Sequence, residues 1–200
     1  MKPLDRKIYL ASKSPRRREL LRQIGIDFEL LLNDKEVDEQ VLPGEKANDY
    51  VTRVTRDKLN SAYHTMLTRQ LRPRPVLAAD TTVVIDGEIL GKPADMAEAV
   101  SMITRLSGRT HQVLTSIAVI SKEKTFQVTQ SSDVAFRALS ECEIRAYCNT
   151  QEPYDKAGAY GIQGLAAAFI QDIAGSHSGI MGLPLFETAQ LLEKAGLRIL

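Results

Sequence analysis

Apolar and polar residues along the chain form blocks that predict strands and helices in alternation. Short apolar runs of strand length occur at Ile8–Ala11 and Phe28–Leu32, and a helical pattern with Leu20, Leu21 and Ile24 on one face lies between them. The continuous apolar run at 76–79 is typical of a strand buried on both faces, and it ends at Asp80. This alternation predicts an α/β fold with a mixed sheet.

The middle and the C-terminal half of the chain carry longer elements. Val83–Ile85 and Glu88–Leu90 flank Asp86-Gly87, a dipeptide that favours a hairpin turn. We further expect strands at Thr110–Ile120, Thr125–Phe136 and Leu165–Ile173, helices at Ala47–Met66, Ala97–Leu106, Glu141–Tyr147 and Leu185–Ala195, and irregular segments at Arg69–Pro75, Tyr154–Gly164 and Gly175–Gly182. No repeat or linker divides the sequence, so we expect a single domain over residues 1–200.

Composition narrows the kinds of partner. The formal net charge of the 200 residues is only +1, which does not favour a nucleic acid or an anionic membrane as a partner. No apolar run reaches the length of a membrane span or a signal-peptide core. Cys142 and Cys148 lie six positions apart, on different faces of one predicted helix, which indicates reduced thiols. We therefore expect a soluble, cytoplasmic protein.

A basic turn joins the first predicted strand to the first predicted helix. Ser14 is a good N-cap residue, and Pro15 suits the first helical position. Arg16, Arg17 and Arg18 then occupy the first turn, where the helix dipole favours acidic side chains instead. Free backbone N–H groups beside several guanidinium groups describe an anion site, most naturally for a phosphate. The alternative, a solvated basic helix end, is equally compatible with this spacing.

Three further features could carry chemistry. Asp80 follows the buried run, where α/β proteins place their sites, although strand-end aspartates often only cap turns. The acidic segment 33–40 could contribute a carboxylate to a divalent cation or be a solvated loop. The glycine-rich stretch 155–164 suits a loop whose backbone approaches a ligand, with Tyr160 and Gln163 to recognise a planar polar group. Cations, carboxylates and such a loop favour metal-assisted phosphate chemistry over covalent catalysis.

Taken together, these motifs resemble the Maf-like proteins, which are nucleoside triphosphate pyrophosphatases. The resemblance covers nearly the whole chain and follows one order: Leu10-Ala11-Ser12-Lys13-Ser14-Pro15-Arg16-Arg17, Ala79-Asp80-Thr81, Gly91-Lys92-Pro93, Leu106-Ser107-Gly108, the run Asp155 to Gly164, and Gly182-Leu183-Pro184-Leu185. It implies a two-lobed α/β fold with an elongated, strongly twisted central sheet flanked by helices. The active site would lie in the cleft, and a homodimer is possible.

The resemblance also implies roles for individual residues. The expected reaction is attack of a water on the α-phosphate, assisted by Mg²⁺ or Mn²⁺, with release of pyrophosphate. Asp80 resembles the catalytic base and a metal contact, and Glu39 resembles the metal-binding carboxylate, although Asp38 is adjacent. The phosphate-binding set would be Ser12, Arg16, Arg17, Lys58 and Lys92, and the positions tied to base selection are Arg16, Thr81 and Gln163.

The run from Tyr154 through Gly164 resembles the branch of the family that prefers dTTP and UTP. Two other hypotheses compete with this one. One is the same chemistry on 7-methyl-GTP, and the other is a non-catalytic nucleotide or nucleic-acid binding regulator of cell division. Lys13 and the long basic loop at 69–75 depart from the usual family pattern without touching the matched catalytic positions.

Overall fold

A seven-stranded mixed sheet forms the centre of the protein, as seen in a computed structural model that describes residues 7–32 and 37–199. Its strands are β1 (Ile8–Leu10), β2 (Phe28–Leu30), β3 (Val76–Ile85), β4 (Glu88–Leu90), β5 (Thr110–Ser121), β6 (Lys124–Phe136) and β7 (Ile170–Ala174). The strand order is β2-β1-β3-β5-β6-β7, with β4 paired to β3. Among the strands of the described residues, only β1 makes parallel pairs, with β2 and β3, so the expected mixed α/β sheet is confirmed.

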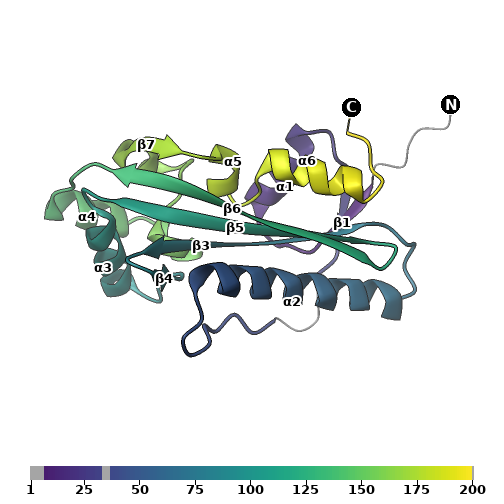
Figure 1. Cartoon of the computed structure of the whole chain (residues 1–200). Coiled ribbons are helices and arrows are strands. Elements are labelled where there is room, and N and C mark those ends of the chain that lie inside the picture. Colours follow the sequence, from purple (N-terminus) through teal and green to yellow (C-terminus); the bar gives the residue numbers. More distant parts are fainter. Residues whose placement is uncertain (1–6, 33–36, 200) are drawn as a thin grey trace.

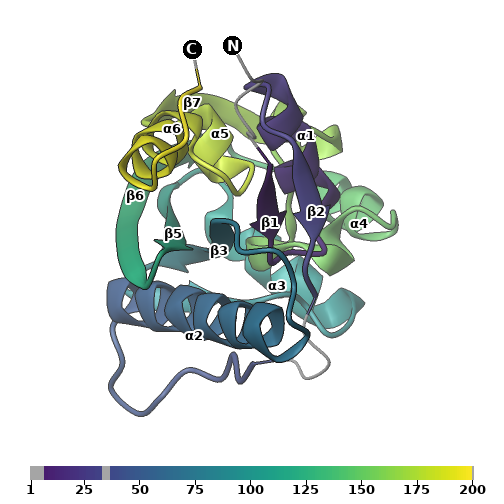
Figure 2. The ribbon, with the colours of Figure 1, turned by 90° about the vertical axis from the view of Figure 1, so that its right-hand side faces the viewer.

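Helices cover both faces of this sheet and one of its ends. The α-helices are α1 (Pro15–Gln23), α2 (Ala47–Thr68), α3 (Met96–Leu106), α4 (Glu141–Cys148), α5 (His177–Ile180) and α6 (Leu185–Lys194). Figure 1 shows α2 along one face of the elongated, twisted sheet, α5 and α6 along the other, and α3 and α4 at one end. Figure 2, turned by 90° from that view, shows β1, β2 and α1 together on the opposite side of β3 from β6.

The long strand β3 is paired differently along its two edges. On one edge it pairs with β5 continuously from Val76 to Val84. On the other edge its recorded partners are β1, at Val76 and Leu77, and β4, at Val83 to Ile85. Within the described part of the chain, the stretch between these two short partners therefore has an open edge.

The face of β3 that packs on α2 contains a polar interruption. Side chains alternate between the faces of a strand, so positions 76, 78, 80, 82 and 84 of β3 point toward α2. The apolar ones belong to two separate core clusters, with Val76 and Ala78 in one and Val84 in the other. Asp80 and Thr82 lie between these clusters. We call the group Thr55, Lys58, Asp80, Thr82 and Ser116 the polar notch.

The expectation that Asp80 ends its strand needs correction. Asp80 does not end its strand, because Thr81 and Thr82 continue the ladder with β5 and β3 runs on to Ile85. Threonine favours extended structure, and the unbroken partner strand keeps these residues in the sheet. Asp80 nevertheless lies beyond the end of the neighbouring β1, so the sheet does change partners at this position.

Two segments near the C-terminus also differ from the sequence-based expectation. The predicted strand at Leu165–Ile173 begins as a 3-10 helix, η3 (Leu165–Phe169), before β7. Its Leu-Ala-Ala-Ala start favours helical turns, and the Glu152 carboxylate accepts hydrogen bonds from the first two N–H groups. The segment predicted as a loop at 175–182 contains α5, which Ser176 caps by accepting from Gly179 N.

The remaining elements agree with the prediction within a few residues. The hairpin turn at Asp86-Gly87 is confirmed, with φ of 55° and 78°, and Ser140 begins α4 with a full capping box. The 154–164 stretch contains only two short 3-10 turns, η1 (Pro153–Asp155) and η2 (Ala157–Ala159). Among the residues described, none of the helices combines the length and the apolar character that crossing a membrane requires.

A buried histidine lies in the main core beside the glycine-rich stretch. His111 on β5 is 2% exposed, and its Nε2 lies 2.7 Å from the Tyr160 hydroxyl. Its ring meets the rings of Phe136 and Tyr160 edge-on at 5.1 and 5.3 Å. Burial lowers the pKa of His111 from 6.5 to about 4. The histidine is therefore neutral in the folded protein at neutral pH.

His111 should make the folded state less stable in mild acid. Below pH 6.5 the unfolded chain binds a proton that the folded chain excludes until about pH 4. Stability then falls as the pH drops through this window, by up to about 3 kcal/mol. The free energy of unfolding, measured by urea denaturation at several pH values, checks this prediction. The His111→Gln variant, which lacks the titrating group, is the control. If the free energy of unfolding changed equally with pH in the two proteins between pH 6.5 and 4, His111 would not be the source of the acid destabilisation.

Candidate active site

The open edge of β3 borders a large cavity of about 1040 Å³. Its wall combines the basic turn before α1, the middle of β3, the turn after β4, and the glycine-rich stretch 152–164. The nine residues that the sequence singled out all line it: Ser12, Arg16, Arg17, Glu39, Lys58, Asp80, Thr81, Lys92 and Gln163. Segments far apart in the sequence therefore contribute to one site.

Arg17 organises the basic side of the cavity. Ser14 caps α1 by accepting from Arg17 N at 3.4 Å, so the side chain leaves the first helical turn in a defined direction. The guanidinium group donates to Ser12 Oγ at 3.1 Å, to the Gly182 carbonyl at 2.8 Å and to Thr81 Oγ1 at 3.2 Å. Three of its five N–H donors are thus fixed by the protein, and two stay available to an anion.

Burial lowers the pKa of Arg17 below its ordinary value of 12.5, and Asp80 acts in the opposite direction. An arginine keeps its charge at neutral pH even so. A fixed guanidinium group in the wall of a cavity is a geometry that suits bidentate binding of a phosphate. The functional interpretation of the basic turn thus has structural support that sequence spacing alone did not provide.

The carboxylates of Asp80 and Glu39 meet at one lysine. Lys58 Nζ lies 2.7 Å from Asp80 Oδ1 and 2.8 Å from Glu39 Oε1. Asp80 is only 7% exposed, and burying its carboxylate without a partner would cost several kcal/mol. Lys58, from the middle of α2, offsets that charge across the polar notch. Lys58 lies against the carboxylates here, so the phosphate-binding role implied for it stays a prediction.

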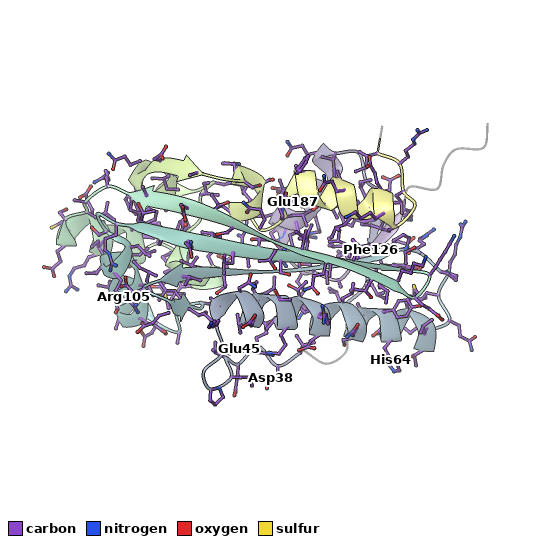
Figure 3. The ribbon with its side chains drawn as sticks, in the orientation of Figure 1. Asp38, Glu45, His64, Arg105, Phe126 and Glu187 are labelled. Atoms are coloured by element: carbon purple, nitrogen blue, oxygen red, sulfur yellow. The ribbon has the colours of Figure 1, made fainter. Side chains whose placement is uncertain are left out.

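The segment that carries Glu39 is anchored to α2. The Tyr50 hydroxyl donates to the Glu39 carbonyl at 3.0 Å, and burial together with Asp80 and Glu39 raises the pKa of Tyr50 to about 12. Arg53 binds both oxygens of Glu45, at 2.6 and 2.8 Å. Figure 3 shows Asp38 and Glu45 on this segment beside α2. Asp38 accepts from Gln40 N instead of facing Lys58, which favours Glu39 as the functional carboxylate.

Glu152 holds the glycine-rich stretch in shape. Its carboxylate accepts from Leu165 N at 2.7 Å, Ala166 N at 3.2 Å and the Tyr147 hydroxyl at 3.2 Å. A Cβ atom at Gly164 would clash with this carboxylate, so a larger residue there would displace Glu152 from its present position. Gln163 precedes Gly164 directly, and its exposed amide lines the cavity. The hydrogen bonds of Glu152 therefore hold the backbone that presents Gln163 to the cavity.

Two cations lie at the mouth of the cavity. Arg16 Nη1 is 3.5 Å from Asp155 Oδ2, so the basic turn and the glycine-rich stretch are linked by an ion pair. Burial acts to raise the pKa of Asp155, but its pairing with Lys156 and Arg16 outweighs burial and lowers that pKa. Lys92 is exposed in the turn after β4 and lines the same cavity.

The sequence interpretation missed several residues of the site. Glu152 shapes the glycine-rich stretch, Tyr50 anchors Glu39, and Gly182 accepts a hydrogen bond from Arg17. Glu152 and Tyr50 each act on a residue distant in sequence, so no local pattern marks them. Gly182 does belong to a quoted motif, and its φ of 112° gives a physical reason for glycine there.

The chemistry of the carboxylates is compatible with a divalent metal. Asp80 and Glu39 already converge on one cation, Lys58 Nζ. Across residues 7–32 and 37–199, no cluster of three or more His, Cys, Asp or Glu side chains is arranged for a metal. Mg²⁺ is often bound by one or two carboxylates with substrate phosphates and water supplying the other ligands. The residues present fit that mode of binding.

Comparison with known proteins gives the same picture over nearly the whole chain. Residues 7–195 match the family model described as Maf-like protein. A dTTP/UTP pyrophosphatase of Aromatoleum aromaticum is 53% identical, covering 98% of both chains. Those of Dechloromonas aromatica and Bordetella avium are 51% and 49% identical, covering 96% of this chain and 98% and 97% of theirs. The chain therefore belongs to the Maf-like protein family.

Proposed function

We propose that this protein hydrolyses dTTP and UTP to the nucleoside monophosphate and pyrophosphate. The observation that carries the proposal is that one cavity is lined both by the buried carboxylate of Asp80, held by Lys58, and by the guanidinium group of Arg17, held by Thr81. The names of the relatives, about half identical over their full lengths, support this substrate class.

The triphosphate would bind on the basic side of the cavity. Arg17 offers two unused N–H donors, and Ser12 Oγ lies 3.1 Å from its Nη1. Arg16 and Lys92 add charge at the mouth. The leaving pyrophosphate gains negative charge as the bond breaks, and fixed cations stabilise that charge without having to reorganise.

Asp80 would act as the general base. Its carboxylate accepts a proton from water as the water oxygen attacks the α-phosphorus. The bond from that phosphorus to the oxygen bridging it to the β-phosphorus breaks, and the electron pair leaves with pyrophosphate. Lys58 holds the carboxylate in place at 2.7 Å. The burial of Asp80 limits competing contacts with bulk solvent.

Asp80 and Glu39 would hold a Mg²⁺ or Mn²⁺ ion. When bound, such an ion offsets phosphate charge and polarises the phosphoryl oxygens. Tyr50 and the Arg53–Glu45 pair keep Glu39 beside the cavity without occupying its carboxylate.

Gln163 would contact the base, because its exposed amide can donate to a pyrimidine carbonyl. Arg16 and Thr81 complete the base-selecting set that the family resemblance implies. We also infer a cytoplasmic location, where Cys142 and Cys148 would remain the free thiols they are here. The homodimer stays a prediction that the molecular mass in solution checks.

Replacing the proposed base should nearly abolish turnover. Asp80→Asn keeps the size of the side chain and removes the proton acceptor, so pyrophosphate release from UTP should fall by at least about 100-fold. Circular dichroism would show that the fold survives. Asp38→Asn is the matched control, because Asp38 lies beside Glu39 and caps a turn. Wild-type turnover in Asp80→Asn would rule out Asp80 as the base.

Changing the amide of Gln163 should alter selection of the base rather than the chemical step. Gln163→Glu removes the amide donor and adds negative charge facing the base carbonyls, so KM for UTP and dTTP should rise about tenfold or more. The kcat value should change far less. Gln40→Glu, outside the cavity wall, serves as the charge-matched control. Unchanged KM values in Gln163→Glu would overturn this role for Gln163.

A further inference from the structure

A chain of hydrogen bonds runs beneath the cavity from Arg17 to helix α5. Thr81 on β3 and Thr115 on β5 are register partners, and their hydroxyl oxygens are 3.0 Å apart. Thr81 Oγ1 accepts from Arg17 Nη2 at 3.2 Å, and Thr115 Oγ1 donates to the Gly179 carbonyl at 2.7 Å. Thr115 is fully buried and no part of the cavity wall, whereas Thr81 lines the cavity.

The two ends of this chain fix the direction of every proton in it. A carbonyl can only accept, so the single hydroxyl proton of Thr115 is committed to Gly179. Thr115 must then accept a hydrogen bond from Thr81, and this bond uses the only hydroxyl proton of Thr81. A guanidinium group can only donate, so Arg17 occupies one acceptor position of Thr81. What Thr81 retains is one acceptor position and no donor.

We propose that Thr115 is a positioning residue that makes Thr81 an obligate hydrogen-bond acceptor, so that the site selects bases carrying an imide N–H. This inference rests on the proposed function, in which Thr81 contacts the base. Uracil and thymine share an N3–H donor between two carbonyls, whereas the N3 of cytosine is an acceptor. Thr81 Oγ1 can accept a hydrogen bond from the N3–H of uracil or thymine. With cytosine, the acceptor N3 would face the acceptor Thr81 Oγ1, and no hydrogen bond would form.

The surroundings of Thr81 leave its remaining acceptor reachable. Gly182 lies over this hydroxyl, and a Cβ atom there would be 3.4 Å from Thr81 Oγ1 and 3.5 Å from Arg17 Nε. A side chain at position 182 would therefore contact this hydroxyl directly. The absence of a side chain at Gly182 thus leaves room for a substrate atom.

The test compares Thr115→Val with Thr115→Ser. Valine has nearly the shape of threonine but cannot accept from Thr81, so the Thr81 proton becomes free to turn into the cavity and to meet cytosine N3. The Gly179 carbonyl retains the Gly182 N–H at 2.9 Å, so the substitution does not leave it unpartnered. Serine keeps the hydroxyl and should keep the selectivity.

The readout is the ratio of kcat/KM for UTP to that for CTP, measured by pyrophosphate release with Mg²⁺. Thr115→Val should lower this ratio about tenfold, and Thr115→Ser should leave it within about twofold. In a Thr81→Ala background, Thr115→Val should have no further effect on the ratio, because it acts through Thr81.

Other outcomes would contradict either the role of Thr115 or the proposed function, and the two cases can be distinguished. An equal loss of activity on both nucleotides in Thr115→Val, with an unchanged ratio, would mean that Thr115 is only structural. Thr115 would also be only structural if Thr115→Val changed the ratio equally with and without the Thr81 hydroxyl. Failure of the unmodified protein to release pyrophosphate from UTP or dTTP would instead reject the proposed function itself.

Discussion

The site depends on how β3 is paired. One edge of this strand is bonded to β5 almost throughout, which fixes the strand rigidly. The other edge is covered only near its ends, by the short strands β1 and β4. The open stretch between them lets one ligand approach both faces of the strand. Asp80 points to the α2 face, and Thr81 points to the opposite face with Arg17.

This arrangement places polar groups inside a hydrophobic layer, and the charged ones, Asp80 and Arg17, are compensated by specific partners. Asp80 interrupts the apolar contact between α2 and the sheet, and Lys58 neutralises it from the facing helix. On the other face, Arg17 is tied to Ser12, Thr81 and Gly182. A buried polar network of this kind is favourable only when its members are satisfied, which also holds the groups in one geometry. Structural stability and preorganisation of the site therefore share the same hydrogen bonds.

Much of the fold could be predicted from the sequence because its strong patterns are local. The Asp86-Gly87 turn, the Ser140 cap and the long strands β5 and β6 follow from turn chemistry and periodicity. The start of β7 could not be predicted, because η3 depends on Glu152, which lies 13 residues earlier. Likewise, local patterns marked Arg16, Arg17, Asp80 and Gln163, and the family resemblance added the other five cavity residues. Tyr50, Glu152 and Thr115 act only through distant contacts, which neither source of information marks. Asp80 seemed to end a strand because the continuous apolar run stops at Ala79, whereas the pairing of β3 with β5, which continues to Val84, depends on a distant segment.

The central claim is that water attacks the α-phosphorus of a nucleotide held at the open edge of β3. Hydrolysis of UTP in water enriched in oxygen-18 tests it most directly, with mass spectrometry of the two products. The account predicts that the heavy oxygen appears in UMP and that pyrophosphate contains none. Heavy oxygen in pyrophosphate, or release of orthophosphate as the first product, would contradict it.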